Sequence, residues 1–240
     1  MKAIIKNLVK KLPIAFTRNQ KYDRQTRQVI KMVCKPESNC IDVGCHKGEI
    51  LDYIRRVAPG GTHYGFEPIP ELFEKLNSKY KNTNCIVQRL AVSNAKGQAS
   101  FNYVISNPSY SGFKKRTYDR PNEKDFEITV DTDLLDNIIP QNLNIDFIKI
   151  DVEGAELLVF EGAERLIKKD KPVIVFEYGI GGSDFYESNP DRIFLLLENH
   201  GLSVSLLDRW LKKLPPLALE EFKREYYQKL NFFFIAYPAN

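Results

Sequence analysis

The sequence lacks the features that mark membrane-spanning, disulfide-stabilised and disordered chains. No stretch approaches the ~18 consecutive apolar residues that a transmembrane helix needs. The four cysteines, Cys34, Cys40, Cys45 and Cys85, include no CxxC pair and have no histidine at zinc-finger spacing. A net charge of +4 is too small to indicate nucleic-acid binding by itself. We therefore expect a soluble cytoplasmic protein with free, buried thiols.

A chain of 240 residues, 43% hydrophobic and 28% charged, is large enough to fold around a sizeable core. Residues 1–37 are predicted to form a helical cap and residues 38–240 the main domain. Within the cap, apolar residues and lysines alternate at helical spacing as far as Pro13, and a second helix is expected over 22–33. The first helix either caps the fold or makes a peripheral contact with an anionic membrane.

From residue 38 onward, short apolar runs alternate with helical patterns. Strands are expected at 39–43, 62–66, 85–90, 145–150, 172–176, 202–207 and 232–237. Helices are expected at 49–57, 70–80, 153–169, 190–200 and 217–230. This alternation predicts an α/β fold that is Rossmann-like and doubly wound, with a seven-stranded, mostly parallel sheet and an antiparallel last strand.

The middle of the chain departs from this rhythm. Residues 98–105 alternate in polarity like one strand of a hairpin, and a polar stretch rich in Ser, Asn, Pro and Lys follows at 106–127. Loops of this length are usually binding loops or disordered, so we expect an inserted substrate loop here. The basic run at 114–116 is typical of a solvated loop, with an anion clamp as the alternative.

Acidic residues gather where the predicted strands end. Glu67, Asp151 and Glu177 each follow a buried strand, and Asp42 lies one residue before the end of another. Because parallel sheets bind ligands at the carboxyl ends of their strands, four acids at one edge indicate a site.

The turn at 42–48 reads Asp-Val-Gly-Cys-His-Lys-Gly. It is not a dinucleotide fingerprint, because His46 and Glu49 stand where the later glycines of GxGxxG belong, and the chain has no GxxxxGK[ST] phosphate loop. Glu67 is placed to bind ribose hydroxyls, or else simply begins a helix. A nucleoside with no phosphate and a cationic tail, as in S-adenosylmethionine, fits this combination.

Three segments carry a family resemblance. They are CIDVG with the glycine at 48, GFEP at 65–68, and DFIKIDVEGAE at 146–156. Together they resemble the class I methyltransferases and, more narrowly, the FkbM family, of which IKIDVEGAE is close to a hallmark. The similarity spans roughly residues 38–178.

The resemblance implies an S-adenosylmethionine-dependent O-methyltransferase that acts on sugars, glycans or natural products and requires no metal. It places Asp42 and Gly44 beside the methionine portion of the cofactor, Glu67 on the ribose, and Asp151 beside the transferring group. The full set of cofactor-binding residues expected is Asp42, Val43, Gly44, Cys45, Gly48, Glu67, Pro68, Ala91 and Asp151.

Methyl transfer to oxygen is an in-line displacement, so alignment supplies much of the rate, and a base that removes the hydroxyl proton helps further. The candidate catalytic residues at the carboxyl edge are Asp151, Glu153, Glu177 and His46. We expect Asp151 to position the reactants. Glu153, at the start of a helix, and Glu177 are expected to contact the acceptor or remove its proton.

Two other functions stay open. A nucleic-acid methyltransferase of the same fold is disfavoured, because the residues from Asp151 to Gly154 include no aromatic side chain to stack on a base, and further carboxylates would repel phosphate. A non-catalytic binding protein on this scaffold is disfavoured by the intact cofactor-site residues.

Overall fold

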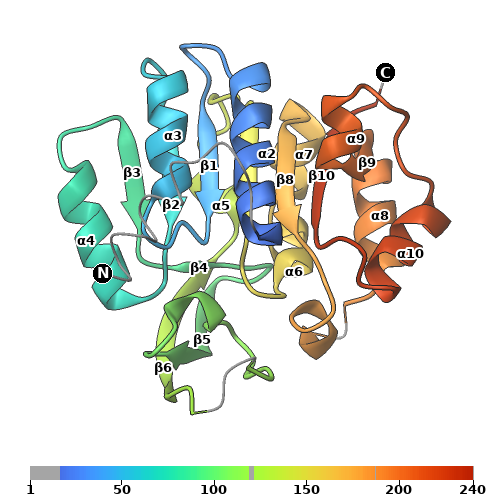
Figure 1. Ribbon diagram of the computed structural model, residues 1–240. Coiled ribbons are helices and arrows are strands. Elements are labelled where there is room, and N and C mark those ends of the chain that lie inside the picture. Colours follow the sequence, from blue (N-terminus) through green and yellow to red (C-terminus); the bar gives the residue numbers. More distant parts are fainter. Residues whose placement is uncertain (1–16, 119–121, 187, 240) are drawn as a thin grey trace, which may run out of the picture.

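The computed structural model describes residues 17–118, 122–186 and 188–239. The strands of its main sheet are β1 Cys40–Val43, β2 His63–Phe66, β3 Cys85–Gln88, β7 Phe147–Ile150, β8 Val173–Glu177, β9 Leu202–Leu206 and β10 Phe233–Pro238. Their order is β3-β2-β1-β7-β8-β10-β9, and β10 is antiparallel to both of its neighbours (Figure 1). The predicted fold, a seven-stranded and mostly parallel sheet with an antiparallel last strand, is confirmed.

Helices cover both faces of this sheet (Figure 1). They are α2 Arg18–Val33, α3 Glu49–Val57, α4 Pro70–Tyr80, α5 Leu135–Ile138, α6 Glu156–Glu161, α7 Glu164–Asp170, α8 Pro190–Asn199, α9 Leu207–Leu211 and α10 Leu219–Tyr227. Among the described helices, none is both long enough and apolar enough to cross a bilayer. The first helix expected from the sequence falls within residues 1–16, outside the described residues.

The helix α2 packs on the sheet face that also carries α3 and α9. It begins at Arg18, four residues before the expected start, because the Thr17 hydroxyl accepts a hydrogen bond from the Gln20 amide and so caps the first turn. Val29 and Ile30 of α2 are fully buried against this face. The domain boundary near residue 37 stays a prediction, since α2 shares a core with the main sheet.

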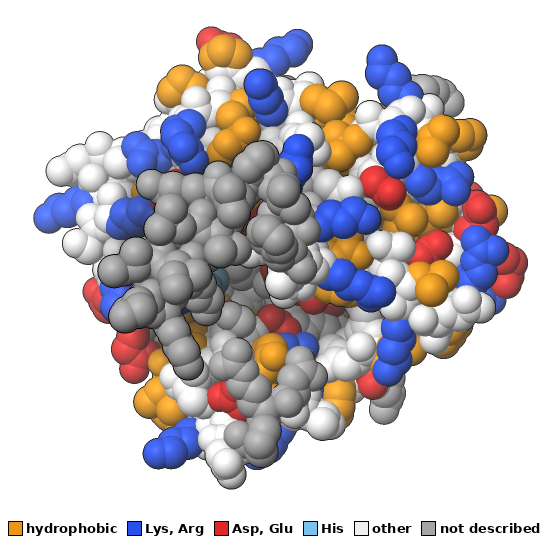
Figure 2. Space-filling view, viewed as in Figure 1, with side chains coloured by type: hydrophobic (Ala, Val, Ile, Leu, Met, Phe, Trp, Pro, Cys, Tyr) orange, Lys and Arg blue, Asp and Glu red, His pale blue; other side chains and the backbone are white. Residues whose placement is uncertain are grey.

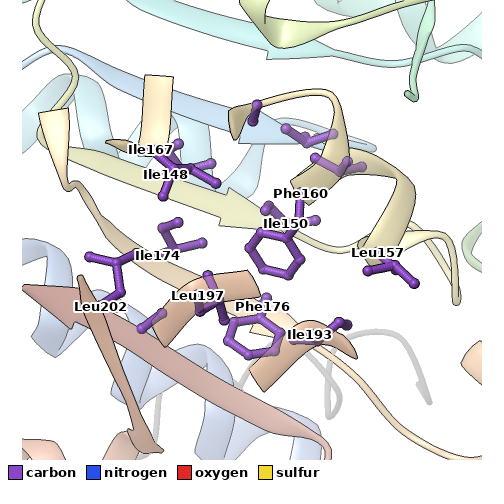
Figure 3. Packing of buried hydrophobic residues seen from close by; sticks show 14 of the residues in the cluster. Ile148, Ile150, Leu157, Phe160, Ile167, Ile174, Phe176, Ile193, Leu197 and Leu202 are labelled. Carbon is purple, nitrogen blue, oxygen red and sulfur yellow. The ribbon is translucent and has the colours of Figure 1, made fainter. Parts of the chain in front are cut away.

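The larger core lies on the opposite face, between the sheet and α6, α7, α8 and α10. Figure 3 shows Ile148 and Ile150 of β7 lying toward Phe160 and Ile167. Since successive strand residues point to opposite faces, Lys149 lies on the other side of the sheet, the side that Asp42 shares in the β1–β7 register. The apolar strands therefore fix which face their few polar residues occupy.

The single helix expected over 153–169 is wrong in two respects. It is divided at Gly162 into α6 and α7, where the Asp136 amide donates to the Gly162 carbonyl oxygen at 3.0 Å and the Asp136 carboxylate accepts the Arg165 amide in the first turn of α7. Glu153 also precedes the helix instead of beginning it, and its φ of 58° places it in the left-handed region.

The expected substrate loop at 106–127 is shorter than predicted, because its last residues belong to a strand. A second sheet, of order β4-β6-β5, contains β4 Ala91–Val92, β5 Gly97–Val104 and β6 Asp125–Asp133. Figure 1 shows it below the carboxyl ends of the main strands. The alternation of Phe126, Ile128 and Val130 with polar residues was the available signal for β6.

Candidate active site

A cavity of about 220 Å³ lies at the carboxyl edge of the main sheet. Most of the residues expected to bind a cofactor or to act in catalysis line it, namely Asp42, Val43, Gly44, Cys45, His46, Glu67, Pro68, Ala91, Asp151 and Glu153. Two do not. Gly48 packs instead under α4, where its carbonyl accepts a hydrogen bond from the Tyr80 hydroxyl at 3.0 Å, and Glu177 lines a neighbouring cavity.

The turn at 42–48 is held in its conformation by contacts with the adjacent strands. The amides of Gly44 and Cys45 both donate to the Phe66 carbonyl at 3.0 Å. Gly44 has a φ of +75°, and a Cβ there would lie 2.0 Å from the carbonyl oxygen of Asp151. From the sequence, we expected Gly44 to allow the close approach of a ligand. The structure shows that the backbone at the end of β7 already requires glycine at this position.

Glu67 is held in place by backbone amides. Its Oε2 accepts the His46 amide at 2.9 Å and its Oε1 accepts the Ile69 amide at 3.0 Å. Burial raises the pKa of Glu67 to about 7, against the opposing effect of these two amides. A carboxylate fixed in this way keeps further lone pairs for ligand hydroxyls, as binding of a ribose requires.

Asp42 is buried, and neither of its oxygens has a hydrogen-bond partner among the described residues. Its closest cation is the Lys149 ammonium, 4.0 Å from Oδ1. Burial raises the pKa of Asp42 to about 6, although Lys149 acts in the opposite direction. Because a buried carboxylate without partners is costly, this side chain fits a cavity that receives a positively charged group.

Lys149 was assigned no role from the sequence, yet it joins two of the acids. Its ammonium lies 2.8 Å from Oδ2 of Asp151, in addition to its contact with Asp42. The available signal was its spacing of two from Asp151, which puts both side chains on one face of the strand. Although burial acts against it, the charge of Lys149 lowers the pKa of Asp151.

Asp151, Glu153 and Glu177 converge, with one oxygen from each lying within 4.8 Å of the others. Burial and the charge of Asp151 raise the pKa of Glu153 to about 8. Burial, followed by the charges of Asp151 and Glu153, raises the pKa of Glu177 well above its usual value. Three oxygen donors at this spacing are also the composition of a hard-cation site, whereas the family resemblance implies that no metal is required.

A second cavity, of about 350 Å³, adjoins the first. Glu153 is the one described residue that lines both. Glu156 and Glu177 contribute further carboxyl groups to the second cavity. In Figure 2, acidic side chains lie in a hollow near the middle of the view. Glu153 therefore stands where a ligand in one cavity would meet a ligand in the other.

Arg116 brings the 106–118 segment into the site. Its guanidinium lies 2.5 Å from Oε2 of Glu153 and 4.6 Å from the ring centre of Tyr110. Its Nε is buried without a hydrogen-bond partner among the described residues. The interpretation of the basic run as a solvated loop is wrong for Arg116, and the partner is a carboxylate of the protein itself.

Glu156 is a further residue that the sequence reasoning missed. Its Oε1 accepts the Val152 amide at 3.2 Å and the Gly154 amide at 3.1 Å, while its buried Oε2 has no partner within the described chain. Burial raises the pKa of Glu156 to about 7. Its place at the end of the IKIDVEGAE segment was the only signal in the sequence.

His46 lies in the wall of the first cavity with a φ of 48°. Burial, and next the charge of Lys47, lower its pKa, so the ring is neutral near pH 7. Its Nε2 is buried and has no hydrogen-bond partner among the described residues. A neutral imidazole with an unpaired nitrogen is able to accept a proton.

Comparison with known proteins agrees with this geometry. The model of the methyltransferase FkbM domain matches residues 42–204. The chain belongs to the FkbM methyltransferase family. No curated protein matches its sequence. The match begins at Asp42, so α2, which contributes Asp23 and Thr26 to the first cavity, lies outside it. No local sequence pattern marked these two residues.

Among solved structures, this FkbM-family chain is similar to the methyltransferase FkbM from Methylobacillus flagellatus KT, with a TM-score of 0.53 and 18% identity. The similarity covers 85% of this chain and 44% of that one, so the chain spans less than half the length of that relative. A putative rRNA-methylase from Clostridium thermocellum, at 10% identity and a TM-score of 0.48, is covered over 99% of its length and 95% of this chain.

Proposed function

We propose that this protein transfers a methyl group from S-adenosylmethionine to a hydroxyl of a sugar, glycan or small natural product. The observation that carries the proposal is the junction of two cavities at Glu153. The first cavity has the acids that a cationic nucleoside needs. The second has polar and aromatic walls suited to a hydroxylated acceptor.

Two carboxylates of the first cavity fit the cofactor, one of them bound by backbone amides and the other without hydrogen-bond partners among the described residues. Glu67 is oriented by backbone amides for ribose hydroxyls, and Asp42 offers two unpaired oxygens to positive charge. Asp151 would lie beside the transferring group. Val43, Gly44, Cys45, Pro68 and Ala91 would form the walls. When bound, the cofactor supplies an electrophilic methyl group; the protein supplies its position.

The second cavity supports a hydroxylated acceptor. Arg116 Nε is an unpaired donor and Glu156 Oε2 an unpaired acceptor, and both belong to residues of this cavity. A hydroxyl group donates and accepts, so a polyol satisfies both. Tyr110 and Phe232 add aromatic surface. The carboxylates here oppose a phosphate backbone, which disfavours a nucleic-acid substrate.

Catalysis would rest on alignment and on one proton transfer. Glu153, at the junction, would accept the proton that the acceptor hydroxyl loses as its oxygen is methylated. Asp151 would act as a positioning residue, since Lys149 holds it, and Glu177 would contact the acceptor. His46 is the second candidate for the proton, because its Nε2 is unpaired.

The test is cofactor binding followed by an acceptor screen. Calorimetric titration with S-adenosylmethionine should show binding that Glu67→Ala weakens by about 1.5–3 kcal/mol, the range for lost hydrogen bonds to a charged group. Glu74→Ala, on the exposed side of α4, is the control and should bind normally. Unchanged affinity in Glu67→Ala would remove Glu67 from the site.

An acceptor screen with the same protein sample then distinguishes the three candidate functions. Incubation with sugars, polyols, phenols and RNA should produce a mass increase of one methyl group in a hydroxylated small molecule. Methylated RNA would instead support the nucleic-acid alternative. Cofactor binding with no transfer to any acceptor would support a binding protein without catalytic activity.

A further inference from the structure

The second cavity carries positive charge at its mouth and negative charge at its floor. Arg18, Arg116 and Lys229 line it from three segments that are far apart in the sequence. Arg18 and Lys229 are exposed, whereas Glu156, a residue of the floor, is 1% exposed. Figure 2 shows Lys and Arg side chains beside the hollow that contains the acidic ones. A ligand with two chemically different ends would therefore bind in one orientation.

Two of these basic residues are held beside each other at the mouth. The Arg18 guanidinium donates from Nη1 to the carbonyl oxygen of Lys229 at 3.4 Å, which joins the start of α2 to the turn after α10. Among the described residues, neither Arg18 nor Lys229 forms an ion pair with a carboxylate. Cations that gather at the wall of a cavity without a counter-ion produce a positive potential there, which attracts an anionic ligand.

Arg116 offers a hydrogen-bond donor deeper in the same cavity. Its Nη2 binds Glu153, and its side chain, 16% exposed, lies over the ring of Tyr110. Its Nε is buried and has no hydrogen-bond partner among the described residues. A buried donor without a partner is costly, and a negatively charged oxygen is the acceptor that a guanidinium binds most strongly. Because the ion pair with Glu153 uses Nη2, the Nε of Arg116 stays available to a ligand.

We propose that the second cavity selects acceptors that carry one anionic group, a carboxylate or a phosphate, in addition to the hydroxyl that is methylated. The anionic group would lie among Arg18, Arg116 and Lys229, and the hydroxyl would lie at Glu153. The inference rests on the proposed function, which makes the ligand of this cavity the acceptor. A sugar acid or a sugar phosphate has both groups on one small molecule. A nucleic-acid strand does not fit in this way, because its further phosphates would meet the carboxylates of the floor.

The test is titration of the full chain with matched pairs of sugars, in the presence of S-adenosylhomocysteine so that no methyl group is transferred. Each pair consists of a neutral hexose and its uronic acid or its phosphate ester, taken for glucose, galactose and mannose. Calorimetry should show that at least one anionic sugar binds about 10-fold or more tightly than its neutral parent, the scale of one hydrogen bond between charged groups. A larger gain for the uronic acids identifies a carboxylate, and a larger gain for the phosphate esters identifies a phosphate.

Variants of the three basic residues assign the gain to this part of the cavity. Arg116→Gln should remove most of it, whereas Arg18→Gln and Lys229→Gln should each reduce it by about 2–5-fold, because solvent screens exposed charges. Lys21→Gln is the matched control, since Lys21 is an exposed cation of α2 that lines neither cavity. This variant should show the same preference as the unmodified chain.

Thermal unfolding identifies any variant that fails to fold, and the double variant Arg18→Gln/Lys229→Gln then replaces Arg116→Gln. Equal binding of neutral and anionic sugars, or no binding of any of these sugars at about 10 mM, would overturn the proposal, as would a preference that every variant keeps. Cofactor titration and the acceptor screen separate the two ideas. Methylation of neutral sugars without an anionic preference removes only the anionic group, and an anionic preference without cofactor binding removes only the proposed function.

Discussion

At the scale of single residues, the backbone of Glu153 is the unusual feature of the site. Its φ of 58° is uncommon for a residue with a long side chain, and Gly154 follows with a φ of 110°. Such conformations cost roughly 1–3 kcal/mol and persist where surrounding contacts enforce them. Here Glu156 accepts the amides on both sides of Glu153. The strain places the Glu153 carboxylate between the cavities.

Replacing that carboxylate should separate binding from turnover. Glu153→Gln keeps the size of the side chain, so we expect normal cofactor affinity by calorimetry. Turnover with an acceptor from the screen should fall by about 10²-fold, the usual contribution of a positioned proton acceptor. Initial rates measured against pH provide the test, with Glu161→Gln as the control.

The pattern of rescue identifies the role of Glu153. Recovery at high pH indicates that the lost group removed a proton. Normal turnover in Glu153→Gln would exclude this role, and His46 would become the principal candidate.

At the scale of elements, the segment 106–118 is held to the site by few contacts. Arg116 pairs with Glu153 and lies over Tyr110, whose ring stacks on Tyr118 with centres 6.0 Å apart. The Lys114 amide donates to the Tyr186 hydroxyl at 3.1 Å. These contacts are few compared with the ladder of the main sheet and involve mostly side chains, so this element is expected to open locally before the sheet does.

Removing the arginine should therefore expose the segment to protease. In Arg116→Gln, trypsin should cut after Lys114 and Lys115, both exposed, about 5–30-fold faster than in the unmodified chain. This is the effect of losing roughly 1–2 kcal/mol from an ion pair and a cation–π contact. Peptide mass mapping over time measures it. Lys96→Gln, which removes the exposed lysine that pairs with Asp133, is the control and should leave the rate unchanged.

The elements also show what the sequence could predict. The turn at 42–48 and the acids at the ends of β2, β7 and β8 were found because their signals are local: a short apolar run, a glycine, an acid. The division between α6 and α7 was missed because the residue that binds the backbone there, Asp136, is distant in the sequence. The contributions of Asp23 and Arg116 were missed for the same reason, since only the folded chain brings them to the cavity.

At the scale of the whole molecule, the buried acids make stability depend on pH. Burial raises the pKa of Glu67 from 4.5 to about 7, so between these values the folded state binds more protons than the unfolded state. Its contribution to stability is therefore full below about pH 4.5 and is lost as the pH rises through 7. Asp42, with its pKa raised to about 6, acts in the same direction.

A matched variant isolates this effect from the buried histidines, which act in the opposite direction. Glu67→Gln resembles the protonated acid at every pH. Without cofactor, the unmodified chain should lose stability relative to Glu67→Gln by up to a few kcal/mol between pH 5 and pH 8, roughly 1.4 kcal/mol for each unit of pKa shift. Denaturant unfolding across this range measures the difference. A constant difference would mean that Glu67 is ionised in the folded state throughout.

The walls of the second cavity come from peripheral segments, and this has an evolutionary consequence. The second cavity, the proposed acceptor side, is surrounded by Arg18 and Asn19 of α2, Arg116, the turn at 179–183 and the stretch at 229–232. The central parallel strands contribute the acids. Substitutions in these outer segments are expected to alter selectivity without changing the turn at 42–48, the proposed donor site. On the proposed function, evolutionary change at Arg116, in the turn at 179–183 or in the stretch at 229–232 is expected to alter what such a chain methylates, and these positions, which do not line the first cavity, are the ones for an engineer to vary.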